Sequence, residues 1–595
     1  MKNLHLLLIC SLVLIIELTF AEAIYVSGDV AGVWSADTVF VTGEIRIPPD
    51  SSLTIEPGVY IWFNSHYKMI VDSNATLMAI GAETDTIRFH SSAWYAYEIY
   101  YGGWHGIRFL NAADESTLKY CQFINGAAYA NYGPNEDKNG GGVYCLESNP
   151  TISNCLFTNC LADYYGGGIY CQDQSDPHIR NCCFDDNVAN VGAAIHCTNS
   201  SPLIENNEII NNYAIDGAGI GCDEAAAPII TSNYISDNLA IGSYSSDGGG
   251  IWSNWANPEI YSNTIINNVA SGSGGGIFVR GFNGVIMDNI IHNNTTINGG
   301  GICCGTDSNP IISNNEVIGN SAGNYYGGGI MFYDNSSPIV NNNLFCGNTA
   351  YSGGGIWCRD DSYPYIINCV IADNTAEYGS GIYVHSCCPE VFNCVIRNFS
   401  TQEIFLDWAA SINITYSNIQ YGWFGQGNID EDPLFITGPF SDYHLGPNSP
   451  CVDTGNPGPQ YDDPEDPQNP GFALWPALGT IRNDMGVYGG DGASGWLGVK
   501  EKERTPLPNG FHLYQNFPNP FNPVTTILFE LPVATHVTLQ VFDVQGRVVA
   551  TLIDGWRTVG IHEVTFEASG LASGVYLYSM SAGNFEGSGK MILLK

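Results

Sequence analysis

Acidic residues recur at one position of a repeated phrase, and their spacing is the first sign of chemistry in this sequence. Each lies seven residues after the first glycine of a glycine cluster: Glu147, Asp173, Glu224, Asp334 and Asp360. If one phrase forms one coil of a stack, Glu147 faces Asp173 and Asp334 faces Asp360. Carboxylates on neighbouring coils lie close enough to repel each other unless a cation lies between them. The pairs suit a calcium site or the acid pair of a glycoside hydrolase; the alternative is a row of solubilising acids in turns.

Large side chains recur at the fifth position of the same phrase. The row comprises Tyr144, Tyr170, His196, Trp252, Phe278, Met331, Trp357 and Tyr383. Ring faces about 5 Å apart match the repeat of sugars along a polysaccharide, so the row is a candidate glycan-binding stripe. The alternative is that these rings stack on one another along a sheet and stabilise it.

The phrase itself occurs ten times between Gly140 and Val384, with successive starts 25 to 31 residues apart. A period in this range is typical of a solenoid. Each copy joins short runs rich in Ile, Val and Tyr through Gly, Pro and Asn, which predicts about three strands and three turns and no helix. The second run follows a proline such as Pro150 or Pro258, and an Asn, Ser or Asp follows four residues later. We expect that residue to take the left-handed conformation and, stacked coil on coil, to form a hydrogen-bonded ladder.

This pattern resembles the right-handed parallel β-helix repeat family, which includes pectate-lyase-like proteins. The resemblance implies an all-β solenoid in which the strand after the glycine cluster lines any substrate groove. The phrase Leu53–Gly58 is similar to the opening coils of that family, and Asp432–Phe435 and Asp484–Tyr488 are similar to its closing segment, expected to cap the last coil. No motif matches the family's catalytic residues, so none is assigned here.

The end of the chain has a different pattern. After residue 511 alternating strands and turns predict a small immunoglobulin-like β-sandwich. Tyr514–Pro523, Phe542–Gly546, Gly574–Tyr576 and Lys590–Lys595 resemble, in order, the C-terminal sorting domain of the type IX secretion system. The resemblance implies the type IX machinery as a partner of residues 511–595, and delivery to the extracellular space or outer-membrane surface.

The beginning of the chain predicts export as well. Lys2, an apolar run and Ala21–Ala23 form a signal peptide, so the mature chain passes through the periplasm and has no transmembrane segment. The expected divisions are a signal peptide at 1–23, an N-terminal cap with the first coils at 24–111, the main β-helix at 112–427, a cap segment at 428–491, a linker at 492–510 and the sorting domain at 511–595.

Composition excludes some partners. The formal net charge of −40 argues against nucleic acid, whose phosphates require Lys and Arg. The nineteen cysteines lie mostly at inward positions of the repeat, such as Cys145 and Cys171, where neighbouring side chains point the same way. That geometry is poor for a disulfide, so we expect mainly buried free thiols. We expect a monomer with no required cofactor. Calcium is the ion that the acid pairs, or the acidic run Tyr461–Pro470, would suit, although we favour a solvated acidic loop for that run.

Three function classes remain open. One is a surface protein that binds glycan or matrix without catalysis, as an adhesin does; another is a polysaccharide hydrolase or lyase; the third is a purely structural rod. A catalytic site should break the repeat at one level, and the sizeable insertions are at 127–139 and 241–247. A lyase needs basic residues, and the ten phrases contain few arginines and no lysine. The regularity of the repeat favours binding or a structural role over catalysis.

Overall fold

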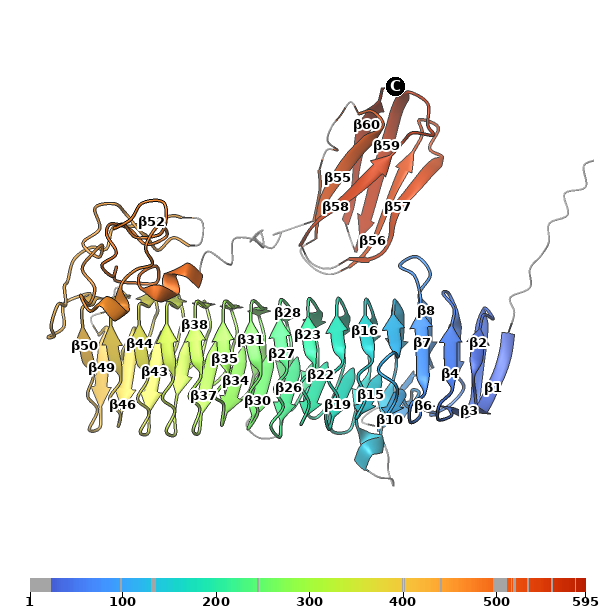
Figure 1. The fold of residues 1–595 in the computed structure, drawn as a ribbon, viewed down its shortest axis with the longest axis horizontal. Helices are drawn as coiled ribbons and strands as arrows, with labels where there is room; N and C mark the ends of the chain where they lie inside the picture. The colour runs from blue at the N-terminus through green and yellow to red at the C-terminus, as the bar shows by residue number, and fades with distance from the viewer. Residues whose placement is uncertain are drawn as a thin grey trace, which may run out of the picture.

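A computed structural model describes residues 23–91, 93–96, 99–129, 135–242, 246–398, 400, 402–438, 441–495, 511–514, 516, 519, 521–531, 535–557, 560–583 and 585–594. The chain forms a rod of stacked β-coils, followed by a small β domain (Figure 1). Residues 1–22 of the predicted signal peptide and residues 496–510 of the predicted linker lie outside the described residues. No helix in the described ranges is long and apolar enough to cross a membrane.

Each phrase forms one coil with three short strands. In the coil that starts at Gly248, β30 (Ile251–Asn254) follows the glycines, β31 (Glu259–Tyr261) follows the proline, and β32 (Thr264–Ile266) completes the coil. Every strand pairs in parallel with its counterpart one coil away, as when Ile251 of β30 lies beside Ile277 of β34 (Ile277–Arg280). The all-β, parallel solenoid predicted from the period is therefore confirmed.

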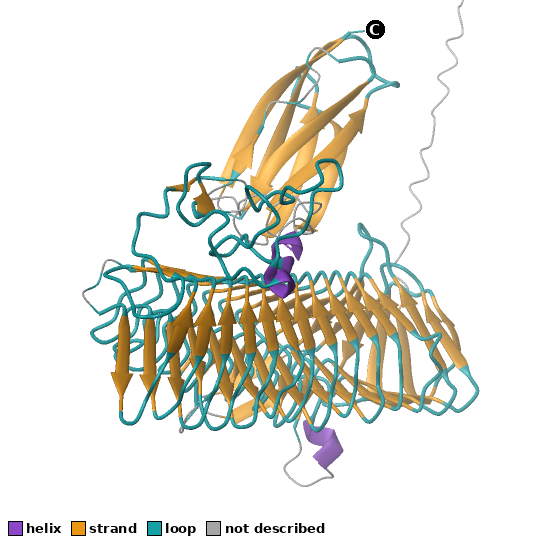
Figure 2. Cartoon of the chain, turned by 60° about the vertical axis from the view of Figure 1, so that its left-hand side comes forward, coloured by secondary structure: helices purple, strands orange, loops and turns teal. Residues whose placement is uncertain are grey.

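The three strands of each coil build three stacks. The proline-led stack has fifteen strands in the described residues, from β2 (Gly32–Trp34) to β50 (Asn413–Thr415). The glycine-led stack runs from β6 (Met69–Val71) through β11 (Ile107–Leu110) and β15 (Val143–Leu146) to β49 (Ile404–Asp407). The third stack runs from β1 (Ala23–Asp29) and β3 (Thr38–Ile47) to β51 (Asn418–Ile419). Figure 2 shows the stacks as rows of parallel arrows.

Inside the rod, rows of identical side chains form the core. Inward Ile, Val and Phe residues of all three stacks belong to one buried cluster. Two asparagine ladders run beside it, because the corners between stacks expose backbone groups that must be paired. The first ladder is Asn207, Asn233, Asn263, Asn289, Asn315 and Asn343; the second is Asn187, Asn212, Asn238, Asn268, Asn294, Asn320, Asn348, Asn374 and Asn398.

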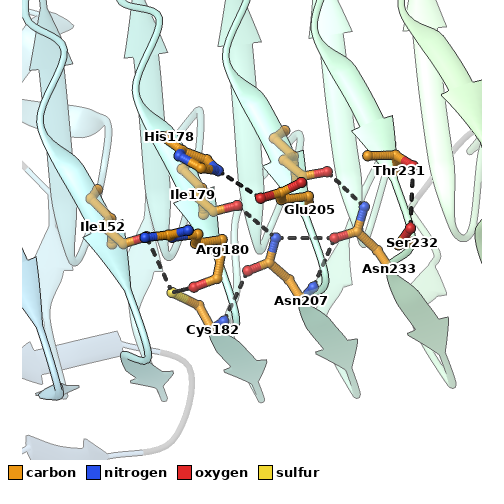
Figure 3. Close-up of polar contacts among 11 residues, drawn as sticks. Ile152, His178, Ile179, Arg180, Cys182, Glu205, Asn207, Thr231, Ser232 and Asn233 are labelled. Atoms are coloured by element: carbon orange, nitrogen blue, oxygen red, sulfur yellow. Dashed lines mark hydrogen bonds and ion pairs between the residues drawn. The ribbon is translucent and has the colours of Figure 1, made fainter.

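One rung shows the geometry of the first ladder. Asn233 Nδ2 donates to the carbonyl of Ile204 (2.9 Å) and to Asn263 Oδ1 (3.0 Å), and the Asn233 N–H donates to the same oxygen (3.0 Å). Figure 3 shows the adjoining rungs, where Cys182 takes the ladder position and its N–H donates to Asn207 Oδ1 (2.9 Å). Each side-chain amide therefore donates one hydrogen bond to a backbone carbonyl of the preceding coil and one to the asparagine of the following coil.

The predicted position of this ladder was wrong by one residue. The Asn four residues after the proline takes the left-handed conformation as predicted, with φ of 55° at Asn154 and 54° at Asn206. Its side chain points outward, however, and the ladder forms at the next residue along the chain. A left-handed residue turns the chain through the corner, so it is the following side chain that faces the interior.

The cysteines occupy the inward rows. All eighteen described cysteines are free, and the row of Cys145, Cys171, Cys197 and Cys222 is buried. In-register neighbours point the same way along the stack, which leaves them as small apolar side chains. The prediction of buried free thiols is confirmed for this row.

The segment after the last coil returns along the side of the rod. Residues 434–495, which we name the return segment, include β52 (Phe435–Ile436), β53 (His444–Leu445), η2 (Pro459–Tyr461) and η3 (Asp491–Ser494). Met485, Val487 and Tyr488 pack against Leu344 and Val370 of the third stack. The expected placement over the last coil was therefore wrong; Trp423 packs against that end of the core instead.

The C-terminal domain contains two antiparallel sheets around one core. One sheet is formed by β54 (His512–Leu513), β55 (Val524–Leu531) and β58 (Gly560–Glu567). The other is formed by β56 (Thr535–Phe542), β57 (Val548–Arg557), β59 (Gly574–Ala582) and β60 (Phe585–Leu593). Apolar residues of both sheets, such as Phe529 and Tyr578, share one buried cluster, which confirms the predicted sandwich.

Candidate functional site

The predicted stripe lies on the outer side of the glycine-led stack, one residue per coil. Met331, Trp357 and Tyr383 are in register, as are Tyr144, Tyr170 and His196. Most of the stripe is nonetheless buried, and only Trp252 and Tyr383 are half-buried. Trp357, for example, is 3% exposed. The rings therefore stack mainly on one another, and sugar binding by the whole stripe stays a prediction.

Tyrosines from the turn before the glycine cluster cover the stripe. Tyr165 stacks on His196 with ring centroids 4.6 Å apart, and Tyr326 stacks on Trp357 at the same separation. The glycines that follow let this turn fold back so closely: an added Cβ at Gly353 would meet the carbonyl oxygen of Ile356 at 2.6 Å. The sequence contained this signal, since a tyrosine precedes the glycines at Tyr165 and Tyr326.

Near the C-terminal end of the stripe the covering rings reach solvent. Tyr325 is 49% exposed and Tyr351 is 44% exposed, and both lie on the turns beside Trp357 and Tyr383. Tyr351 contacts Tyr378 edge to face at 5.5 Å. We name this group the tyrosine patch; its members are Tyr325, Tyr326, Tyr351, Tyr378 and Tyr383.

A polar row borders the tyrosine patch. Arg359, His385 and Asp407 are in register at the last position of three successive strands of the glycine-led stack. Asp407 accepts hydrogen bonds from the Tyr383 hydroxyl (2.9 Å) and contacts His385 Nδ1 (3.2 Å), and these contacts lower the pKa of the carboxyl. The Arg359 guanidinium lies 5.4 Å from the Trp357 ring centre. Rings beside paired polar groups provide both contacts that a sugar requires, stacking and hydrogen bonding.

The predicted acid pairs lie in left-handed turns at the end of these strands. The φ values are 46° for Glu147, 47° for Asp173, 53° for Asp334 and 50° for Asp360. Asp173 accepts a hydrogen bond from Asn199 Nδ2 (3.2 Å), and Asp360 forms an ion pair with Arg359 (2.5 Å). In the described ranges no three His, Cys, Asp or Glu residues are grouped so as to hold a metal ion. A metal or acid role for these pairs stays a prediction.

The acidic run at 461–470 has structural contacts. The buried Asp463 carboxylate accepts hydrogen bonds from the N–H groups of Gly490 (2.5 Å) and Asp484 (3.3 Å). Burial and the charge of Asp484 raise the pKa of Asp463 well above its usual value. Glu465 in turn accepts a bond from the Gly471 N–H (2.7 Å). These acids hold the return segment in its fold.

The raised pKa of Asp463 predicts a pH dependence of stability. Because the folded carboxyl holds its proton more tightly than the unfolded one, stability is full below the unfolded pKa of about 4 and falls as pH rises through the folded pKa. We expect a fall of up to about 1.4 kcal/mol per pH unit from this group, measured by urea unfolding between pH 5 and pH 8. The Asp463→Asn variant should show a weaker dependence of the unfolding free energy on pH, and the Asp462→Asn variant should show the same dependence as the parent protein. Equal slopes in all three proteins would contradict the prediction.

A charged cluster that the sequence did not reveal lies under the insertions of the first coils. The insertions include β9 (Ala93–Ala96), β10 (Ile99–Gly102) and η1 (Asn135–Lys138). His105 Nδ1 lies 2.8 Å from His66 Nε2, and Lys68 Nζ lies 3.0 Å from Asp137. Burial lowers the pKa of both imidazoles, so they are neutral near pH 7.

Arg108 completes this cluster. It is buried, and its Nη1 donates to the carbonyls of Asn139 (2.7 Å) and Gly140 (2.6 Å). Nε and Nη2 have no hydrogen-bond partner among the described residues. The cluster breaks the repeat at one level, as expected of a catalytic site. Only the insertion at 127–139 indicated this cluster, because its residues come from three separate segments of the chain.

A cleft runs along the corner between the proline-led and third stacks. Its volume is about 1010 Å³, and its floor includes the outward Asn154, Asn181 and Asn206. Glu208, on its third-stack wall, is buried, and burial together with the neighbouring Asp185 raises its pKa to about 8. On the proline-led stack beside it, Glu205 contacts His178 Nε2 at 2.8 Å, as Figure 3 shows. Sequence reasoning did not find this cleft.

Family comparisons agree with these observations. The model of the right-handed β-helix region matches residues 91–265 and 250–420, more than half of the chain. The chain belongs to the right-handed β-helix family. The β-helix is followed by a match to the secretion system C-terminal sorting domain at residues 515–594. This tail assigns the β-helix protein to those exported to the cell surface or extracellular space.

Comparisons with individual proteins add little about function. The β-helix protein is 33% identical over 106 residues to metabotropic glutamate receptor-like protein R of Dictyostelium discoideum. The match covers 17% of this chain and 6% of that protein. No solved structure matches.

Proposed function

We propose that this secreted β-helix protein binds an extracellular glycan or matrix polysaccharide without cleaving it, as an adhesin does. The tyrosine patch carries the proposal, because exposed Tyr325 contacts Tyr326, which stacks on Trp357, and exposed Tyr351 contacts Tyr378. The polar row borders the patch, since the Tyr383 hydroxyl donates to Asp407. Ring faces supply apolar contact with sugars, and Arg359, His385 and Asp407 supply hydrogen bonds to hydroxyl groups. The rigid stack holds these groups in place, which lowers the entropy lost on binding.

A glycan array probed with the mature protein, with and without calcium, tests this proposal. We expect at least one glycan to bind, and Tyr325→Ala with Tyr351→Ala to raise its Kd roughly tenfold or more, since each ring contact contributes about 1 kcal/mol. Tyr365→Ala is the matched control, because Tyr365 is similarly exposed but lies on the proline-led stack. An array without hits, or unchanged binding by the double variant, would contradict the proposal.

Polysaccharide cleavage is the second candidate, and the charged cluster is the observation that favours it. His66, His105, Lys68 and Asp137 bring acid–base groups together at the level of the insertions. Scanning each array hit for cleavage products separates the two functions. Products that disappear in a His105→Gln variant would place catalysis at this cluster, whereas binding without products supports the adhesin.

A further inference from the structure

Outward asparagines of the rod hold the backbone of the return segment. These asparagines occupy the same left-handed corner position of the coil as the asparagines on the floor of the cleft, which lies nearer the N-terminus. Asn342 Nδ2 donates to the carbonyls of Val487 (3.0 Å) and Gly489 (2.7 Å). The bonds from the neighbouring coils run from Asn314 to Gly492 (3.1 Å) and from Asn368 to Asp484 (2.8 Å) and Gly486 (3.2 Å). Successive coils thus bind one polypeptide through its carbonyl groups, and the asparagines become buried.

Glycine makes this contact so close. An added Cβ at Gly492 would collide with Asn342 Oδ1, and one at Gly495 would collide with Asn314 Nδ2. Gly490 also has a φ of 71°, which other residues rarely adopt. A polypeptide bound in this way therefore needs a glycine roughly once per coil.

The same corner continues towards the N-terminus beyond the return segment, where Arg557 of the C-terminal domain also lines the cleft and forms an ion pair with Glu83 (2.6 Å). Asn154, Asn181 and Asn206 have φ values of 55°, 51° and 54°, close to the 54° of Asn342. Asn181 and Asn206 are exposed and Asn154 is half-buried, and none of the three has a side-chain hydrogen bond in the described part of the chain. They project into the cleft at intervals of one coil, as the occupied asparagines do.

The wall of the cleft differs from the wall beneath the return segment. Where the return segment lies, the wall consists of Leu344, Val370 and Val395, which contact apolar residues. At the equivalent positions of the cleft the wall consists of Leu156, Cys183, Glu208 and Tyr234. An occupant that suits this wall presents basic or amide side chains to Glu208 in place of Met485 and Val487.

We propose that this cleft binds a glycine-containing polypeptide segment of another protein, held through its carbonyls by Asn154, Asn181 and Asn206. The cleft lies on the same left-handed corner as the asparagines that hold the return segment, with Ser232, Ser262 and Asp288 between the two sets, and it offers the same donors at the same spacing. Basic or amide side chains of the partner face Glu208. This inference is independent of the glycan proposal, since the cleft and the tyrosine patch lie on different stacks.

A peptide-binding experiment with the full-length protein tests this inference. The probe is a labelled synthetic peptide with the sequence of residues 483–495 in which Lys replaces Met485 and Val487. We expect binding by fluorescence anisotropy, and a roughly tenfold or greater rise in Kd for Asn181→Gly with Asn206→Gly. Glycine retains the left-handed corner and removes only the amide. The peptide with Ala at positions 489 and 492 should not bind.

Asn267→Gly provides the matched control. Asn267 is an exposed residue with a φ of 57°, but it lies at a different corner of the coil, so its replacement should leave the Kd unchanged. The tyrosine double variant should also bind the peptide normally, which separates this site from the glycan site. An unchanged Kd in the Asn181 and Asn206 variant, equal binding of the alanine peptide, or no binding at millimolar peptide would each overturn the inference.

Discussion

The Asn263→Leu variant is expected to unfold with roughly 3–6 kcal/mol less free energy than the parent protein. Asn263 Nδ2 donates to the carbonyl of Ile230 (2.8 Å) and to Asn289 Oδ1 (3.1 Å), and Asn263 Oδ1 accepts from the N–H of Asn233 (3.0 Å). Leucine has a similar size but leaves these buried groups unpaired, and each unpaired group costs about 1–3 kcal/mol. Urea unfolding followed by circular dichroism measures the loss.

Asn267→Leu is the control for this experiment. Asn267 also adopts a left-handed conformation, but it is exposed and its side chain is not part of a ladder. The same replacement there should cost about 1 kcal/mol, through backbone strain alone. Equal losses in both variants would show that the ladder contributes no more than the turn does. Hydrogen exchange should locate the larger effect in the coils on either side of Asn263.

Removal of residues 511–595 is expected to abolish secretion and leave the rod in the periplasm. The domain has its own buried core, and its match to the sorting-domain family covers residues 515–594. Because the rod's core cluster contains no residue of this domain, the truncated rod should keep its fold. Cell fractionation measures the location, and protease resistance of the periplasmic product measures the fold.

The parent chain in the same host provides the comparison for secretion. A truncated rod recovered from the medium in parental amounts would contradict the sorting assignment. A truncated rod that is degraded in the periplasm would instead show that the rod requires its tail for folding. The two results are distinguished by the fraction in which fragments appear.

Periodic features of the molecule could be predicted from the sequence. A residue type repeated every 25 to 31 positions must occupy the same place in each coil, so the strands, the left-handed corners and the buried Cys145 row followed directly. The ladder was misplaced by one residue because Asn206 and Asn207 are both asparagine, and spacing alone does not say which one faces inward. The stripe's register was evident from the spacing, whereas its burial under Tyr165 and Tyr326 depends on how the preceding turns fold back, which the spacing does not show.

Features that occur at only one place in the molecule could not be predicted from the repeat. The charged cluster joins His66, His105, Arg108 and Asp137, which no period relates. The return segment was expected over the last coil because nothing in its sequence reveals which surface it covers. Its glycines were visible, but their purpose depends on the asparagines they contact.

The path of the return segment also determines how the rod carries mechanical load. Gly495, where the described part of this segment ends, lies against Asn314 rather than at the last coil. A pull transmitted from an anchored tail would enter the rod there, across the bonds from Asn314, Asn342 and Asn368 acting together. Such loading acts on these contacts before it acts on the final coil. The end of the rod beyond Asn368 would bear little tension while the protein is held at a surface.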